Sequence, residues 1–122
     1  LPEALPNAAS RAALPTTVEV VGVGRFDADV EATVYFCCLE AMQNAGKHAG
    51  ADAEIVVSVE RDEDRLTFEV RDDGAGFDAG PAAARGHGFV NMADRLGTIG
   101  GRLTVSSTLG AGTTIRGEIP LP

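Results

Sequence analysis

The sequence has no tryptophan and only one tyrosine, and its single lysine is Lys47. Basic residues are scarce: ten Lys and Arg stand against eighteen Asp and Glu, giving a formal net charge of −8. This balance argues against binding to duplex nucleic acid, which requires a basic face, and gives no support for direct contact with an anionic membrane surface. No apolar run is long enough to span a bilayer. The sequence begins with Leu1 and not with an initiator methionine, and we therefore expect it to be a piece of a longer protein.

Cysteine is nearly absent as well, and the two that occur, Cys37 and Cys38, are adjacent. Neighbouring side chains on a helix diverge by about 100°, which disfavours a disulfide between them or a shared metal ion. We therefore expect two buried free thiols in a reducing compartment.

What is present is enough for one domain with its own core: 122 residues, of which 44% are hydrophobic. The patterns predict helices at 27–48 and 89–99, a short helix beginning near Asn7, and a loop at 73–88. Asp27 or Asp29 would cap the long helix. Strands are expected at 16–21, 54–60, 65–71, 102–107 and 113–119. Because most of these strands are joined as hairpins, we expect a mixed, mostly antiparallel sheet with its helices on one face, a two-layer α/β sandwich.

A polar stripe interrupts the long helix. At about 100° per residue, Glu40, Asn44, Lys47 and His48 fall on one face. A solvated face would explain Glu40 and Lys47, and the helix dipole would explain His48. Asn44 is harder to explain this way, because Asn is a poor helix former between apolar turns. Its amide oxygen suits Mg²⁺, and Glu40 one turn earlier could orient a water or accept a proton.

Two strands carry polar residues on their inward faces. Asp72 shares the parity of Leu66, Phe68 and Val70, and Thr113 shares that of Ile115. A capping Asp and an ordinary β-branched Thr are the simpler interpretations. An inward carboxylate is nevertheless costly to bury without a donor, and a purine amine would be one.

Glycines flank these positions in two places. Gly74 and Gly76 follow Asp72 and would let a flat ligand approach the backbone. Gly86-His87-Gly88 precedes the second helix, where exposed N–H groups favour an anion. A flexible loop before a helix is the alternative interpretation of this second group.

Together these motifs resemble the catalytic, ATP-binding domain of bacterial sensor histidine kinases, part of the GHKL ATPase superfamily. Glu40-x-x-x-Asn44-x-x-Lys47-His48 resembles the N box of that family, and the segment from Asp72 to Phe77 its first glycine box. The second glycine box and the closing glycine-threonine element are matched by 86–92 and 110–114. The resemblance extends from residue 27 to the C-terminus.

The resemblance implies a fold of the Bergerat type, with ATP bound between the helices and a mobile lid at about 77–87. It implies that Asp72 accepts a hydrogen bond from the adenine amine, and that Thr113 supports Asp72 through water. Asn44 would coordinate Mg²⁺ and act with Glu40 in catalysis, while Lys47 and His48 contact phosphates. The nucleotide would also be bound by the glycine-box residues Gly74, Gly76, Gly86, His87 and Gly88.

The family also implies partners that this sequence lacks. Its phosphoacceptor histidine lies on a separate dimerisation domain, and neither His48 nor His87 occupies such a motif. We therefore expect ATP binding without autophosphorylation by this piece alone, and relay of the phosphoryl group to a response regulator. The short lid and the Met92-x-x-Arg95-x-x-x-x-Gly100-Gly101 run resemble those of kinases whose response regulators have helix-turn-helix outputs. Residues 1–26 would form a connecting helix and first strand, and residues 27–122 the ATP-binding domain.

A cytoplasmic location follows from this resemblance, either for a soluble kinase or for the cytoplasmic part of a membrane-anchored sensor. Two alternatives stay open. One is a serine kinase of the anti-sigma-factor type, whose N box typically differs from this one after its Asn. The other is a non-catalytic module that keeps a nucleotide site for interaction only.

Overall fold

The structure, a computed structural model, describes residues 4–21, 24–50, 52–75, 89–107 and 110–121, except the side chain of His48. Its helices are α1 (Ala4–Ser10), α2 (Ala28–His48) and α4 (Phe89–Gly97). Its strands are β1 (Thr16–Val21), β2 (Ile55–Arg61), β3 (Arg65–Asp72), β4 (Arg102–Ser107) and β5 (Thr113–Pro120). All five predicted strands are confirmed, with ends that differ from the prediction by at most one residue.

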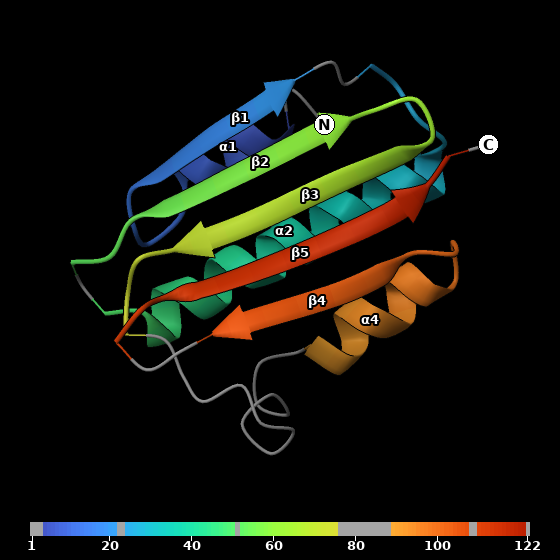
Figure 1. Ribbon diagram of the computed structural model, residues 1–122. Coiled ribbons are helices and arrows are strands. Elements are labelled where there is room, and N and C mark those ends of the chain that lie inside the picture. Colours follow the sequence, from blue (N-terminus) through green and yellow to red (C-terminus); the bar gives the residue numbers. More distant parts are fainter. Residues whose placement is uncertain (1–3, 22–23, 51, 76–88, 108–109, 122) are drawn as a thin grey trace.

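The five strands form one sheet in the order β1-β2-β3-β5-β4 (Figure 1). β1 and β2 are parallel because α2 connects them, and the other three pairs are antiparallel. The three helices in the described ranges lie on the same face of the sheet, with α1 against β1, α2 against β2 and β3, and α4 against β4. The prediction of a mixed, mostly antiparallel, two-layer α/β sandwich is therefore confirmed.

The core lies between the helices and the inward side chains of the sheet, which form rows across neighbouring strands. Most of these side chains are branched aliphatic residues, and Phe68 is the largest fully buried side chain. Its aromatic ring fills the space above Gly117, its partner on β5, where any Cβ would collide with the ring. Three apolar rows are Val18, Val57, Val70, Ile115 and Val105; Val20, Val59, Phe68, Gly117 and Leu103; and the pair Leu66 and Ile119.

Helix α2 is the central helix of the second layer. Val34, Cys38, Ala41 and Ala45 recur at spacings of three and four, and all are buried. Asp27 stands at the N-cap position but its side chain makes no capping hydrogen bond. The helix passes through Gly46 and ends before Gly50, whose φ of 102° only glycine adopts without strain.

Both shorter helices differ from their predicted bounds. Helix α1 begins at Ala4 rather than near Asn7, because Pro6 falls within the first turn, where a missing N–H breaks no helical hydrogen bond. Helix α4 ends at Gly97 rather than at Ile99. The chain then turns back, with the Gly101 N–H donating to the Leu96 carbonyl at 2.8 Å.

The two cysteines are free and buried, as expected. Burial is the main cause that raises the pKa of the Cys37 thiol to about 12, and it raises the pKa of Cys38 further still. Within the described ranges, no helix is both long and apolar enough to cross a membrane.

Candidate nucleotide-binding site

A fourth row of inward residues, next to the row of Val70 and Ile115, is polar except for the buried Ile55 of β2. In this row Asp72 of β3 pairs with Thr113 of β5, and Thr113 pairs with Ser107 of β4. All three are half-buried. The row lies at the end of the sheet where α2 also ends (Figure 1). The alternation that fills the core with aliphatic side chains thus aims a carboxylate and two hydroxyls at this end.

Asp72 is held by backbone donors. Its Oδ1 accepts a hydrogen bond from the Gly74 N–H at 3.0 Å. Burial raises the pKa of the Asp72 carboxyl, and the N–H groups of Gly74 and Thr113 offset part of that shift. The carboxylate is therefore fixed in orientation and only partly solvated, so a further donor would stabilise its charged form.

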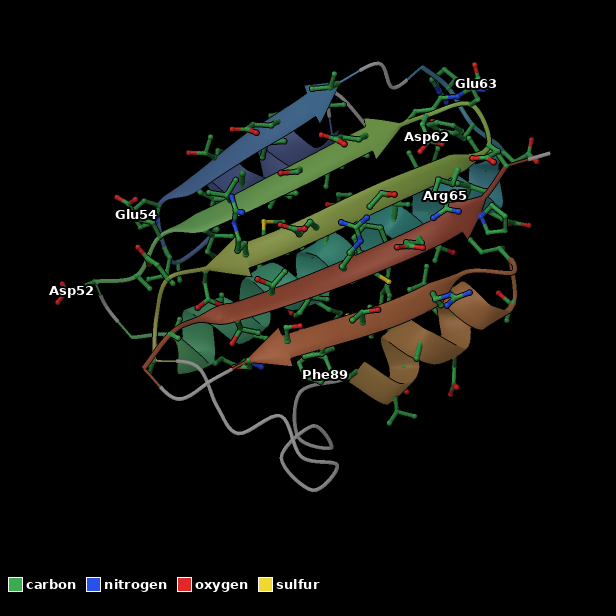
Figure 2. All side chains as sticks on the ribbon, viewed as in Figure 1. Asp52, Glu54, Asp62, Glu63, Arg65 and Phe89 are labelled. Carbon is green, nitrogen blue, oxygen red and sulfur yellow. The ribbon has the colours of Figure 1, made fainter. Side chains whose placement is uncertain are left out.

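The neighbouring carboxylate, Asp73, points elsewhere. Its Oδ1 accepts from the Glu54 N–H at 2.7 Å and secures the start of β2. Figure 2 shows Glu54 and Asp52 at this same end of the sheet. Of the two consecutive acids, only Asp72 belongs to the inward row.

The glycine loop after β3 packs closely on the end of α2. The Ala75 N–H donates to the Ala49 carbonyl at 2.9 Å. A Cβ on Gly74 would stand 2.7 Å from the Ala49 Cα, nearer than real Cβ atoms approach. Glycine at this position is thus required by packing between the loop and the helix that carries Asn44.

The turn before β5 packs against the backbone of Asp72 and Asp73. Gly112 has a φ of 85°, and a Cβ there would meet the carbonyl of Asp72 and stand 3.2 Å from the Asp73 Cα. The Thr113 hydroxyl lies 2.8 Å from that of Ser107, which also lies 3.2 Å from the Gly112 carbonyl. Ser107 was missed as a site residue, although it shares the parity of Leu103 and Val105 and could have been found that way.

The polar stripe of α2 is only partly brought to this end. Glu40 and Asn44 are half-buried and Lys47 is exposed. Asn44 precedes Ala49 by five residues, about 7.5 Å along a helix axis. His48 is the last residue of α2, but its side chain lies outside what the structure describes.

Lys47 also lines a groove of about 530 Å³ between α1 and α2. The groove is largely apolar, with Leu39 and Met42 on the α2 side and Ala8 on the α1 side. Lys47 therefore lies at the edge between this groove and the polar stripe.

The remaining predicted positions, Gly76, Gly86, His87 and Gly88, lie outside the described residues, as does the predicted lid at 77–87. The description resumes at Phe89, the buried first residue of α4 (Figure 2). The Arg95 guanidinium of α4 lies 4.0 Å from the ring centroid of Phe36, which joins α4 to α2.

Among the described side chains, no group of three or more His, Cys, Asp or Glu could hold a metal ion. A Mg²⁺ ion carried by a nucleotide does not need such a group, since one or two protein oxygens suffice beside phosphates and water. The half-buried amide of Asn44 fits that limited requirement.

Sequence comparison supports a nucleotide site. The family described as "Histidine kinase-, DNA gyrase B-, and HSP90-like ATPase" matches residues 29–122. The chain is 33% identical over 102 residues to the signal transduction histidine-protein kinase/phosphatase DegS of Brevibacillus brevis, and 34% identical over 98 residues to the oxygen sensor histidine kinase NreB of Staphylococcus carnosus. These matches cover 83% and 80% of the chain but only 26% and 28% of the two relatives.

Solved structures share the fold. The histidine kinase domain of the Erythrobacter litoralis EL346 blue-light activated kinase matches with a TM-score of 0.77 and 21% identity, over 97% of this chain and 56% of that one. The mycobacterial sensor histidine kinase MprB matches with a TM-score of 0.68 and 16% identity, over 98% and 91%. The chain therefore belongs to the histidine kinase-, DNA gyrase B- and HSP90-like ATPase family, and within it to the ATP-binding catalytic domains of histidine kinases.

Proposed function

We propose that this domain binds Mg-ATP at the polar end of the sheet and donates the γ-phosphoryl group to a histidine on a separate dimerisation domain. The observation that carries the proposal is the partly desolvated, backbone-anchored carboxylate of Asp72 in the polar row at the end of the apolar core. Such a group is costly unless a ligand supplies a donor.

Asp72 recognises the base in this proposal. Its carboxylate accepts from the exocyclic amine of adenine, with Thr113 beside it on β5. The absence of a side chain at Gly74 and Gly112 keeps this loop and turn close to the strand ends. A flat purine would then lie against backbone rather than against side chains.

The polar stripe of α2 handles the phosphates. Asn44 would hold Mg²⁺ through its amide oxygen, and the ion, bound with the nucleotide, offsets the negative charge of the phosphate chain. Lys47 is exposed, so its ammonium group can reach a phosphate from the helix surface. We assign His48 a phosphate contact as well. Glu40, half-buried one turn before Asn44, orients a water or accepts a proton.

The glycine boxes complete the site. Gly76, Gly86, His87 and Gly88 would border the nucleotide, with residues 77–87 as the lid and the start of α4 as an anion site. These assignments are proposals, since those residues lie outside the described ranges.

In the proposed transfer, the bond between the γ-phosphorus and the β,γ-bridging oxygen breaks, ADP leaves, and a bond to an imidazole nitrogen of the acceptor histidine forms. The domain contributes position and electrostatic stabilisation rather than a covalent intermediate. The isolated domain binds ATP without autophosphorylating. In the whole protein, a response regulator with a helix-turn-helix output receives the phosphoryl group, and the reaction takes place in the cytoplasm.

Calorimetric titration with Mg-ADP and Mg-ATP tests the proposal. We expect the wild type to bind both, Asn44→Ala to weaken the dependence of binding on Mg²⁺ because the oxygen ligand is removed, and Gln43→Ala to bind normally. Gln43→Ala is a matched control because it removes a side-chain amide from the exposed neighbour of Asn44 on α2. A folded wild-type domain without nucleotide affinity would contradict the proposal.

A second measurement separates the alternatives. The full-length protein is incubated with labelled ATP, and the modified residue is identified by its acid stability. Acid-labile phosphohistidine supports the proposal. Acid-stable phosphoserine on a partner protein would indicate the serine kinase instead, and binding without any transfer the non-catalytic module.

A further inference from the structure

We propose that the groove between α1 and α2 docks an amphipathic helix of a partner protein, one whose apolar face is bordered by acidic side chains. This inference goes beyond the nucleotide function proposed above and does not depend on it. It concerns the side of α2 that faces α1.

The groove has an apolar interior of about 530 Å³. Among its lining residues, Met42 and Ala8 are 3% and 4% exposed. Tyr35 and Leu39 beside them are only half-buried, so part of their apolar surface still contacts water. Removing such surface from water is the main favourable contribution to association, and an occupant with an apolar face would therefore be stabilised here.

The charges at the groove are cations without a partner. Among the described residues that line it, Arg11, just after α1, and Lys47, on α2, carry charge, and both are exposed. Within the described ranges neither forms an ion pair or lies over an aromatic ring, although most arginines there do one or the other. In a chain of net charge −8, a cation on each wall of one groove favours an occupant that carries carboxylates.

The walls of the groove favour a helix as that occupant. One wall is α2, and the other is α1 with the turn after it, in which the N–H groups of Arg11 and Ala12 donate to carbonyls of α1 at 3.1 Å. Neither wall offers the row of free backbone groups that an edge strand offers, so a docked segment must satisfy its own backbone, as a helix does. On α2, Tyr35 and Lys47 are separated by about 18 Å along the axis, the length of about three helical turns.

The simpler interpretation is a solvated surface groove with two unpaired cations. The domain as a whole is strongly negative, so non-specific attraction would favour a basic peptide over an acidic one. The proposed site predicts the opposite preference, because salt screens the more distant charges while the two cations border the groove itself. The sign of the preference therefore distinguishes the two interpretations.

The test uses the folded domain without nucleotide and two synthetic peptides. Each peptide has about 18 residues, long enough to be partly helical in water, and both carry the same leucine stripe. The stripe is bordered by Glu in one peptide and by Lys in the other. Fluorescence anisotropy at physiological salt should give an affinity about tenfold higher for the Glu peptide. The amide NMR shifts that this peptide causes should lie along α1 and the facing side of α2.

Four variants locate the binding. Arg11→Glu should lower the affinity for the Glu peptide about tenfold and remove its advantage over the Lys peptide. Arg102→Glu makes the same charge change at an exposed position on the outer face of β4 and should alter neither affinity. Leu39→Ala should lower the affinity for both peptides about fivefold and leave their ratio unchanged. Val21→Ala, which truncates a side chain on β1 that is 62% exposed, is its control and should have no effect.

The inference would be overturned if the folded wild type did not bind the Glu peptide, or bound the Lys peptide as tightly. Equal losses in Arg11→Glu and Arg102→Glu, or shifts confined to other parts of the domain, would overturn it as well. Self-association of the wild type in sedimentation, with shifts along the groove, would assign the groove to a second copy of the chain instead. If Leu39→Ala does not fold, the two arginine variants decide the question, since both change exposed side chains. Failure to bind ADP would overturn the proposed function and leave this inference unaffected.

Discussion

The two ends of the sheet are built by the same strands with the same alternation, yet their inward positions differ in kind. At the hairpin end, Leu66 and Ile119 are 0% and 1% exposed. The charged residues there, such as Asp62 and Arg65, lie at the turn and the surface (Figure 2). At the other end the inward row continues from the buried Ile55 of β2 into the polar residues Asp72, Thr113 and Ser107. The first end contributes stability, whereas the second holds a partly buried carboxylate at the place where we propose that the nucleotide binds.

The largest effect is expected on stability, when a member of the apolar rows is removed. Phe68→Ala should lower the free energy of unfolding by about 3–5 kcal/mol, because Gly117 opposite has no side chain to fill the cavity. Urea unfolding of the variant measures this loss. Thr67→Ala, on the outer face of the same strand, is the control and should cost far less. A loss below about 1 kcal/mol in Phe68→Ala would mean that the row repacks.

At the polar end the largest expected effect is on binding. Asp72→Asn should lower the affinity for ADP about a hundredfold, since hydrogen bonds to a charged partner contribute about 1.5–3 kcal/mol each. Glu69→Gln makes the same charge change on the outer face of β3 and should leave the affinity unchanged. Equal losses in the two variants would show that net charge, and not the inward row, governs binding.

The pH dependence of stability should distinguish Asp72→Asn from the wild type. The pKa of Asp72 is raised in the fold above its ordinary value of 3.8, chiefly by burial, so the folded state holds the proton longer than the unfolded state. Stability from this group is fully present below that ordinary value and is lost as the pH rises through the raised pKa. Thermal unfolding between pH 3 and 7 should therefore show Asp72→Asn gaining stability relative to the wild type as the pH rises. A constant difference would contradict the raised pKa.

A smaller effect is expected at the turn before β5, where two glycines share a positive φ. Gly110 has a φ of 81° with open space around its missing Cβ, whereas Gly112 has a φ of 85° and backbone atoms of Asp72 in the way. Gly110→Ala should cost about 1 kcal/mol of stability. Gly112→Ala should lower stability by about 2–3 kcal/mol and should also lower the affinity for ADP. Equal costs would show that φ alone, and not the contact with Asp72, sets the requirement for glycine.

The smallest effect belongs to the charged surface near the hairpin end. Arg65 and Glu118 form an ion pair of 3.3 Å in which both side chains stay partly exposed. A double-mutant cycle with Arg65→Ala and Glu118→Ala should give a coupling of about 0.2–1 kcal/mol that decreases with added salt. A larger, salt-independent coupling would mean that this end is held by more than its apolar row.

The local pattern of apolar and polar residues was sufficient to predict much of the fold and part of the candidate site. The period of two gave the strands and the inward direction of Asp72, and the period of three to four gave α2. The order of the strands depends on long-range pairing, which no local pattern contains, so the neighbourhood of Thr113 and Ser107 became visible only in the sheet. Ser107 was missed because a small neutral residue carries little signal until its partners are known. The start of α1 differs from the prediction because a proline such as Pro6 is compatible with the first turn of a helix as well as with a break before it.

The buried thiols of Cys37 and Cys38 can report how often this domain opens. Both are 0% exposed, and burial keeps them protonated at neutral pH. A thiol reagent can modify them only after α2 separates from the sheet, so the labelling rate counts opening events of the central helix. Bound nucleotide should lower the rate of thiol labelling, and a nucleotide that binds more tightly should lower it more. The measurement requires no probe to be added to the protein.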